Sequence, residues 1–339
     1  MSVYLVDNVN GGHHNIYQST LKKIDDTIIL NKIIKFTEVK KGIFKAYNER
    51  AKFIKYVNSQ VKESDLIHFL YIDSLYKCPF IDFELRKDRK YIGTLHWIPK
   101  DNLRKILLKR FSRRFLVIIV HSEFLKEELL KIGITNIEVI DYPSFIRERE
   151  DINNRNDNKI IVSCLGGTRY DKGLDILSKS FNYLDEECKK KVVFNICGAE
   201  EDIRYDDIIS SANINKIKLE YKNKFLTEEE YEDEIYRSDV ILLPYRSIFS
   251  GNSGPMTDGI YANKFIIGPE EGNLGYLIKK YNLGITFESE NFIDLAYKIN
   301  YAAKVDLFKI HNFKEKLRIS NFIDKHRRVY SLAMSKREN

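Results

Sequence analysis

A chain of 339 residues is longer than one ordinary hydrophobic core accommodates, so its length favours two domains of roughly 150 residues each. With 43% hydrophobic and 12% aromatic residues but only 16 Gly and 6 Pro, the composition excludes a long disordered tail. The net charge of +7 arises from 56 basic and 49 acidic residues without the pattern of a nucleic-acid-binding module, which favours a Lys-rich surface over nucleic-acid binding.

The cysteines and the apolar runs favour a cytoplasmic protein. Four cysteines lie far apart and form no C-x-x-C pair, as expected of buried thiols in a reducing compartment: Cys78, Cys164, Cys188 and Cys197. The first residues, MSVYLVDNVNGG, pass directly into a strand pattern, so we expect no signal peptide. The longest apolar run, from Phe115 to Val120, is far shorter than the roughly 20 residues that span a bilayer.

The first part of the chain alternates strand and helix patterns. An apolar strand from Val3 to Asp7 is followed by the loop Asn10-Gly11-Gly12-His13-His14 and by a helix from Tyr17 to Ile24. Further strands are predicted at residues 27–30, 33–38, 65–70, 91–96, 115–121 and 137–140, and helices at 47–61 and 122–132. This alternation predicts a parallel sheet that helices cover on both faces.

A basic segment runs from Lys100 to Arg114 and contains one acid, Asp101. Its apolar residues recur at three- and four-residue spacing: Leu103, Ile106, Leu107 and Phe111. The spacing predicts a helix with an apolar stripe beside a basic face. Two interpretations stay open. The helix either binds an anionic membrane surface, to which each basic residue contributes about 1 kcal/mol, or packs on its own sheet with solvated lysines.

Residues 147–158, REREDINNRNDN, are polar and charged, and we interpret them as a linker. Beyond it, strands are predicted at residues 159–165, 192–197, 217–219, 239–243, 264–268 and 284–287. Helices are predicted at 174–184 and 227–237, the second opened by a capping box of Thr227 and Glu230, and residues 291–334 are largely helical. A second doubly wound domain follows, and such sheets bind ligands at the carboxyl ends of their strands.

Two segments of the second domain have the features of a phosphate site. After the strand that ends at Leu165, Gly166 and Gly167 form a turn that leads to Arg169 and Lys172. A planar guanidinium and a compact ammonium both suit a diphosphate whose negative charge grows as a bond to it breaks. The stretch PYRSIFSGNSGPMTDGIYANKFIIGP, residues 244–269, places small residues before a helix, where free N–H groups attract phosphate. Neither segment matches a P-loop, a dehydrogenase fingerprint or a hydrolase nucleophile elbow.

The turn LGGTRYDKGLDIL resembles the Gly-x-x-Arg-x-x-Lys-Gly-Leu-Asp motif of the retaining GT-B-fold nucleotide-sugar glycosyltransferases, a large bacterial, family-4-like group. Three other segments are similar to that family: SDVILLPYRSIFSGNSGPMTDGIYANKFIIGP, YIGTLH and VIIVHSEFLKEELLKIGITNIEVIDYPS. The resemblance implies an α/β fold of two doubly wound Rossmann-like domains facing across a cleft, with a C-terminal helix that crosses back to the N-terminal domain. The expected division is an acceptor-side domain at 1–146, the linker at 147–158, a nucleotide-sugar-binding domain at 159–312 and the returning helix at 313–339.

The resemblance also implies roles for individual residues. The implied donor-binding residues are Gly11, Gly12, Gly167, Arg169, Lys172, Ser253, Gly254 and Asp258, of which Asp258 would bind the ribose. The implied catalytic residues are His96, Arg169 and Lys172, and the implied acceptor-binding residues are His13 and His14.

The implied activity is transfer of a sugar from a nucleoside-diphosphate-sugar donor to a glycan or lipid-linked glycan acceptor, with retention of configuration, in surface polysaccharide or glycoconjugate synthesis. We expect no metal or other cofactor, because the chain has no Asp-x-Asp pair to hold a cation against the diphosphate. Ser250 stands where many members of the family carry the first of two glutamates. A non-catalytic partner subunit of the same fold, which binds an acceptor or an active transferase, is therefore an alternative.

Overall fold

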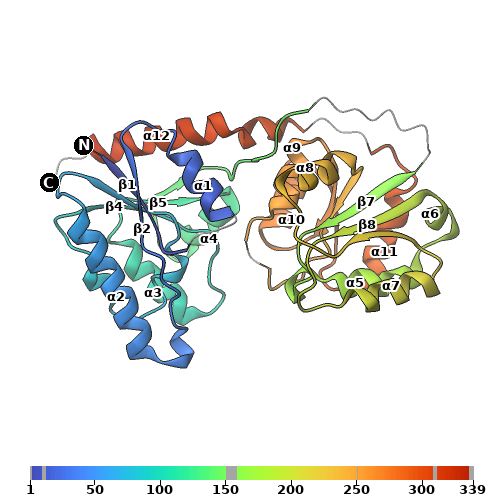
Figure 1. Ribbon diagram of the computed structural model, residues 1–339, viewed down its shortest axis with the longest axis horizontal. Coiled ribbons are helices and arrows are strands. Elements are labelled where there is room, and N and C mark those ends of the chain that lie inside the picture. Colours follow the sequence, from blue (N-terminus) through green and yellow to red (C-terminus); the bar gives the residue numbers. More distant parts are fainter. Residues whose placement is uncertain (1, 10–12, 150–158, 250, 308–310, 336–339) are drawn as a thin grey trace. The chain divides into compact units, whose positions relative to one another are not determined.

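The computed structural model describes residues 2–9, 13–149, 159–249, 251–307 and 311–335. Within these residues the strands form two six-stranded parallel sheets, ordered β2-β1-β3-β4-β5-β6 and β12-β11-β10-β7-β8-β9 (Figure 1). The chain divides into unit 1, Met1–Pro143 with Arg318–Asn339, and unit 2, Ser144–Leu317. The predicted α/β class with two Rossmann-like sheets is confirmed. The predicted domain junctions stay predictions, and residues 150–158 of the predicted linker lie outside the described residues.

Unit 1 contains the strands β1 (Val3–Asp7), β2 (Thr27–Asn31), β3 (Leu66–Phe69), β4 (Lys90–Thr94), β5 (Val117–Val120) and β6 (Ile137–Val139). Its α-helices are α1 (His13–Leu21), α2 (Ile43–Gln60), α3 (Asn102–Ser112), α4 (Glu123–Lys131) and α12 (Ile319–Ser335). The strands of unit 2 are β7 (Ile160–Leu165), β8 (Val192–Cys197), β9 (Lys218–Lys222), β10 (Val240–Leu242), β11 (Phe265–Pro269) and β12 (Gly284–Phe287). Its α-helices are α5 (Leu174–Ser180), α6 (Glu186–Lys191), α7 (Tyr205–Ile214), α8 (Glu228–Arg237), α9 (Gly254–Tyr261), α10 (Gly272–Lys280) and α11 (Phe292–Ala302).

The sheet of unit 1 is covered on both faces, as the strand pattern of β3 illustrates. Ile67 and Phe69 pack in the core beneath α2, α3 and α4. His68, which points to the opposite face, lies 2.8 Å from the hydroxyl of Tyr330 in α12, because successive residues of a strand alternate between faces. The predicted return of the C-terminal helix to the N-terminal unit is therefore confirmed (Figure 1).

One predicted strand is wrong. Residues 33–38 alternate apolar and polar side chains, but the strand β2 ends at Asn31 and no strand is assigned to 33–38. The Ile34 N–H donates to the carbonyl of Asn8 at 2.9 Å, and the Thr37 N–H donates to the carboxylate of Glu49 in α2 at 2.6 Å. A loop carbonyl and a side chain satisfy these backbone groups in place of a sheet ladder. The alternation indicated an extended segment but not its hydrogen-bond partners.

The helix α3 forms within the predicted basic segment, but its apolar residues do not make one buried stripe. Leu108 and Phe111 are buried, and the Phe111 ring packs against Phe115 with centroids 5.1 Å apart. Leu103 and Ile106, in the first half of the helix, are 65% and 63% exposed. The C-terminal half of α3 therefore joins the core, whereas the N-terminal half presents apolar side chains to solvent.

Unit 2 has the same layered arrangement. The helices α5, α7 and α11 pack on one face of its sheet through a core that includes Leu177, Ile208 and Ile299. The helices α8, α9 and α10 cover the other face through Ile235, Ile260 and neighbouring residues (Figure 1). Both faces of every central strand are thus buried, which explains the continuous apolar runs of β7 and β10 in the sequence.

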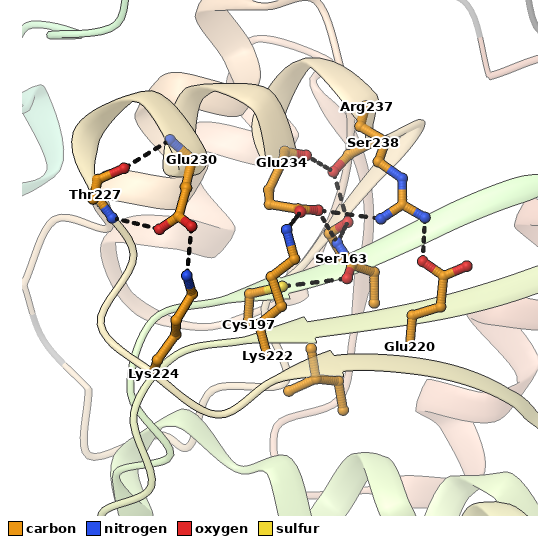
Figure 2. A network of polar contacts seen from close by, with 12 residues as sticks. Ser163, Cys197, Glu220, Lys222, Lys224, Thr227, Glu230, Glu234, Arg237 and Ser238 are labelled. Carbon is orange, nitrogen blue, oxygen red and sulfur yellow. Dashed lines mark hydrogen bonds and ion pairs between the residues drawn. The ribbon is translucent and has the colours of Figure 1, made fainter.

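A polar network fixes α8 against the strands of unit 2 (Figure 2). The predicted capping box is confirmed, since the Thr227 side chain accepts from the Glu230 N–H at 3.2 Å and the Glu230 carboxylate accepts from the Thr227 N–H at 3.0 Å. Farther along the helix, the buried Glu234 carboxylate accepts from Asn195 in β8 and from Lys222 in β9, each at 2.6 Å. Each bond joins the helix to a different strand, so the network positions α8 on the sheet.

Replacing Glu234 with alanine is expected to lower the free energy of unfolding by about 2–3 kcal/mol, because hydrogen bonds to a charged group are lost and the buried Asn195 amide keeps only its longer hydrogen bond, to the Ser163 hydroxyl at 3.2 Å. Urea unfolding followed by circular dichroism measures this change. The control is Glu229→Ala, an exposed residue of the same helix, for which we expect a change below about 1 kcal/mol. Equal stabilities of the two variants would contradict a structural role for the network.

Candidate functional site

The glycine turn after β7 places Lys172 back over the end of that strand. Gly166 has φ +104°, and its N–H donates to the carbonyl of Cys197 at 2.7 Å. The Lys172 Nζ donates to the carbonyl of Leu165 at 3.4 Å, and a Cβ atom on Gly166 would lie only 2.2 Å from that Nζ. Gly166 is therefore needed for its backbone conformation and for the space that the lysine ammonium occupies.

Lys172 and Ser253, both predicted donor-binding residues, contact the same aromatic side chain, Tyr245. The Lys172 Nζ lies 5.9 Å from the centroid of the Tyr245 ring, and the Tyr245 hydroxyl is 3.2 Å from the Ser253 Oγ. Ser253 is the N-cap of α9, and its Oγ accepts the Met256 N–H at 3.3 Å. An ammonium near the ring of one tyrosine and a helix N-terminus at its hydroxyl form a positively polarised region that suits a phosphate group. Tyr245, which follows the predicted strand 239–243, was not among the predicted site residues.

The Arg169 guanidinium is paired with Asp171 in a two-bond arrangement. Its Nε and Nη2 donate to the two carboxylate oxygens at 2.9 and 2.8 Å, and this hydrogen bonding raises the pKa of Arg169. The Arg169 side chain is 47% exposed, so the ion pair is worth at most about 1 kcal/mol. A diphosphate could therefore displace Asp171 from the guanidinium at small cost.

A carboxylate lies close to Gly167. A Cβ atom on Gly167 would meet Oε1 of Glu201 at 1.8 Å, and the Glu201 N–H donates to the Thr168 hydroxyl at 2.8 Å. An anionic group that binds at Gly167 requires the Glu201 side chain to rotate away, and this side chain is exposed to solvent. Glu201 could not be predicted as a neighbour of this turn, because it follows a different strand, β8, and approaches the turn only in the folded sheet.

The Asp258 carboxylate is engaged at both oxygens within unit 2. The Ser144 hydroxyl donates to Oδ1 at 2.7 Å, and the Tyr231 hydroxyl donates to Oδ2 at 2.9 Å. Asp258 is 8% exposed, and this burial raises its pKa to about 6 although both hydroxyls favour the ionised form. A ribose hydroxyl would have to share these oxygens or displace a partner, so ribose binding by Asp258 stays a prediction.

In unit 1, three rings stack in sequence at the carboxyl end of the sheet. The His14 ring lies 3.8 Å from the Tyr71 ring, and the Tyr71 ring lies 4.1 Å from the His96 ring on its other side. Tyr71 follows β3 and His96 follows β4, whereas His14 is in α1. The structure thus brings the predicted residues His14 and His96 together through a tyrosine that the sequence did not single out.

The hydrogen bonds of His96 define what its ring can do. The Nε2 lies 3.0 Å from the carbonyl of Leu70, which can only accept, so Nε2 carries the proton. Burial, with a contribution from His121, holds the pKa of His96 well below 6.5, so the ring is neutral at pH 7. The remaining nitrogen, Nδ1, can then accept a hydrogen bond from a sugar hydroxyl but cannot donate one.

Gly11, Gly12 and Ser250 lie outside the described residues, and the same holds for the side chain of His13. Gly254 is the first residue of α9, where Pro255 follows it. Among the described residues, no group of three or more His, Cys, Asp or Glu side chains could hold a metal ion.

The two units together have the fold of the GT-B glycosyltransferases, although no family model and no curated protein matches the sequence. The chain is similar to sucrose-phosphate synthase of Thermosynechococcus elongatus, with a TM-score of 0.70 and 14% identity over 98% of both chains. It is similar to a glycosyltransferase of Rickettsia africae, with a TM-score of 0.70 and 16% identity over 99% of both chains. At these identities the likeness shows the fold.

Two further neighbours were solved with UDP. Anabaena HepE, in complex with UDP and glucose, has a TM-score of 0.71 and 12% identity, with 98% of this chain and 100% of that chain covered. Staphylococcus aureus TarM, in a complex that includes UDP, has a TM-score of 0.60 and 15% identity over 84% of this chain. This chain spans 59% of the length of that TarM chain.

Proposed function

We propose that the protein is a glycosyltransferase that takes a sugar from a nucleoside diphosphate donor. The observation that supports this most is the placement of the Lys172 ammonium and the Ser253-capped N-terminus of α9 around Tyr245. A cation and free N–H groups in one place suit a diphosphate, which must accept negative charge when it leaves. The shared fold with neighbours that bind UDP supports the same donor class.

In this proposal the diphosphate is stabilised by Lys172, by Arg169 after it exchanges Asp171 for the substrate, and by the first N–H groups of α9. The neutral His96 accepts a hydrogen bond from the donor sugar or the acceptor. The acceptor is a glycan or a lipid-linked glycan of bacterial surface polysaccharide or glycoconjugate synthesis. The reaction retains configuration and uses no metal. The resemblance to the family-4-like enzymes supports these finer assignments.

A partner subunit that does not turn over a donor is the second candidate. Three described carboxylates favour it, because they already occupy places that a donor would need: Asp171 on Arg169, Glu201 against Gly167, and Asp258 with two internal donors. The two candidates differ in whether nucleotide is released.

The test is release of nucleoside diphosphate from a panel of nucleotide sugars, with UDP-glucose, UDP-N-acetylglucosamine and GDP-mannose included. The transferase proposal expects release from at least one donor, accelerated when the correct glycan acceptor is added. Release from none of them, with or without a lipid-linked glycan extract, would favour the partner subunit.

We further propose that α3 docks on an anionic membrane surface. Leu103 and Ile106 expose their apolar side chains on a helix that also carries Arg104, Lys105 and Lys109. The nearby aromatic residues Phe80 and Phe83 are 57% and 63% exposed and flank the guanidinium of Arg110 at 4.9 and 4.6 Å. Exposed apolar side chains among basic ones are the composition of an interfacial helix. No helix among the described residues is long and apolar enough to cross a bilayer.

Replacing both Leu103 and Ile106 with serine is expected to reduce sedimentation with anionic liposomes by at least about tenfold. The reason is that two aliphatic side chains that become buried in the lipid contribute more than about 1.4 kcal/mol to the free energy of binding. Reversing the charges of Arg104, Lys105 and Lys109 should have a similar effect at low salt. Ile214→Ser, an equally exposed residue of α7, serves as the control. Unchanged sedimentation of both α3 variants would remove the membrane proposal.

A further inference from the structure

Two asparagine side chains of unit 2, Asn252 and Asn273, form a hydrogen-bonded pair that leaves two amide atoms without a partner. The Asn273 Nδ2 donates to the Asn252 Oδ1 at 2.8 Å. The other two atoms, the Asn252 Nδ2 and the Asn273 Oδ1, are buried and have no hydrogen-bond partner among the described residues. The whole Asn273 residue is 3% exposed. Because a buried amide atom without a partner is costly, we expect the pair to bind a group that supplies the missing hydrogen bonds.

The two free atoms define the chemistry of that group. The Asn252 Nδ2 can only donate a hydrogen bond, and the Asn273 Oδ1 can only accept one. Exchanging the nitrogen and oxygen positions of both amides reverses these roles and still leaves one donor and one acceptor. An ionised phosphate or carboxylate oxygen only accepts, so it would be repelled by the free carbonyl oxygen, whereas a hydroxyl group both donates and accepts. The pair therefore suits a sugar hydroxyl better than an anion.

The strand order of unit 2 places this pair beside the region proposed for the diphosphate. The strands β7, β10 and β11 are neighbours in a parallel sheet, so their carboxyl ends lie at one edge. Lys172 lies over the end of β7. Asn252 and Ser253 follow β10, and Asn273 follows β11. Neighbouring strands are about 4.8 Å apart, so roughly 10 Å separates β7 from β11, a span that a phosphate and its attached sugar can cover.

The backbone holds both asparagines in place before a ligand binds. Gly272, with φ +66°, turns the chain into α10 after β11. The helix passes so close to the end of the strand that a Cβ atom on Gly275 would lie 2.0 Å from the carbonyl oxygen of Glu270. Asn252 directly precedes Ser253, the N-cap of α9. A site that is ordered in advance loses little conformational freedom when it binds its ligand.

We propose that Asn252 and Asn273 bind a hydroxyl group of the donor sugar and thereby set the sugar specificity of the enzyme. This inference rests on the proposed function and deepens it, because it assigns the residues that distinguish one nucleotide sugar from another. The Asn252 amide donates to the hydroxyl oxygen, and the hydroxyl donates to the Asn273 Oδ1. A sugar that lacks this hydroxyl leaves two buried amide atoms unpaired, and such a loss is an effective means of rejecting a similar substrate.

The test measures dissociation constants by calorimetry for the full chain without an acceptor. The ligands are UDP-glucose, UDP-N-acetylglucosamine and GDP-mannose, with UDP and GDP as references that carry no sugar. For the nucleotide sugar that binds the wild-type protein most tightly, we expect N252A and N273A each to weaken binding about tenfold. Binding of the matching nucleoside diphosphate should change by less than about twofold, which also shows that the variants are folded.

The matched control is N213A. Asn213 is an exposed residue of α7, which packs on the face of the sheet opposite to α9 and α10. Its replacement removes the same side chain from the same unit, and we expect no change in the binding of either the nucleotide sugar or the nucleoside diphosphate.

Monodeoxy analogues of the same nucleotide sugar identify the hydroxyl group. One analogue should bind the wild-type protein about tenfold more weakly than the parent nucleotide sugar, whereas N273A should bind the two equally well. A purely structural role of the asparagine pair would not depend on one position of the sugar.

Two results would overturn the inference. One is that N252A and N273A weaken the binding of the nucleotide sugar no more than that of the nucleoside diphosphate, because the pair would then serve only the fold. The other is that every monodeoxy analogue loses the same affinity for the wild-type protein as for N273A. If the wild-type protein binds none of the nucleotides, the proposed function itself fails. Failure of the inference alone is distinct, since the wild-type protein then binds a nucleotide sugar and the two variants bind it equally well.

Discussion

Replacing Lys172 with alanine is expected to lower the rate of sugar transfer by about 10²–10³-fold, the usual effect of removing one group that stabilises charge in a transition state. The Lys172 ammonium lies over the end of β7 beside Tyr245, where the diphosphate is proposed to leave. The expected loss for Arg169→Ala is smaller, because Asp171 already offsets part of the guanidinium charge. Initial rates of nucleoside diphosphate release measure both.

Lys179→Ala provides the matched control for this prediction. Lys179 is a lysine of the adjoining helix α5, it is 62% exposed, and its ion pair with Asp175 is a surface pair of little energetic weight. Its removal changes the net charge by the same amount as the loss of Lys172. If both variants lost activity equally, a general electrostatic attraction of the donor would replace the specific role of Lys172.

Acidification from pH 6.5 to 4 is expected to destabilise unit 1 strongly. Burial lowers the pKa of His121 to about 4 and that of His326 to about 3, and it also holds those of His68 and His96 well below 6.5. These rings bind protons in the unfolded chain but not in the folded unit, so stability present above pH 6.5 is lost as the pH falls. The loss from His121 alone is on the order of 3 kcal/mol at pH 4.

One carboxylate of unit 1 acts in the opposite direction. Burial raises the pKa of Asp73 to about 7, so this group adds stability as the pH falls from 7 toward 4. Four histidines outweigh it, and the net effect is acid unfolding. The fluorescence of Trp97, the single tryptophan of the chain, reports on unit 1. His326→Gln should move the unfolding midpoint to lower pH, and a wild-type signal that stays native down to pH 4 would contradict the prediction.

Much of the fold could be predicted from local patterns. The strand Val3–Asp7 and the capping box of Thr227 and Glu230 are short-range features, and the structure reproduces both. The prediction of a strand at residues 33–38 was wrong because a strand requires a neighbouring strand to pair with. The backbone N–H groups of Ile34 and Thr37 instead donate to a loop carbonyl and to a carboxylate of a helix. Alternation of apolar residues reports an extended backbone, whereas pairing depends on the rest of the chain.

The candidate site could also be predicted only in part, because some of its contacts join residues that are close in the sequence and others join residues that are far apart. The turn with Arg169 and Lys172 is contiguous in the sequence, and resemblance identified it. The partners of Asp258 are not contiguous, since Ser144 is 114 residues away, so its internal hydrogen bonds could not be inferred. His14 was a predicted site residue, but its contact with the Asp7 carboxylate, at 2.8 Å, depends on how α1 packs beside β1.

The most direct test of a nucleotide-sugar site is a thermal-shift titration of the wild-type protein and K172A with UDP, GDP, ADP and their sugar derivatives. A ligand that binds only the folded state raises the unfolding temperature with the logarithm of its concentration. We predict such a rise for the wild-type protein with at least one nucleoside diphosphate and its sugar, and a much smaller rise for K172A. No shift with any of these ligands, or equal shifts for the two proteins, would contradict the assignment of a diphosphate site at Lys172.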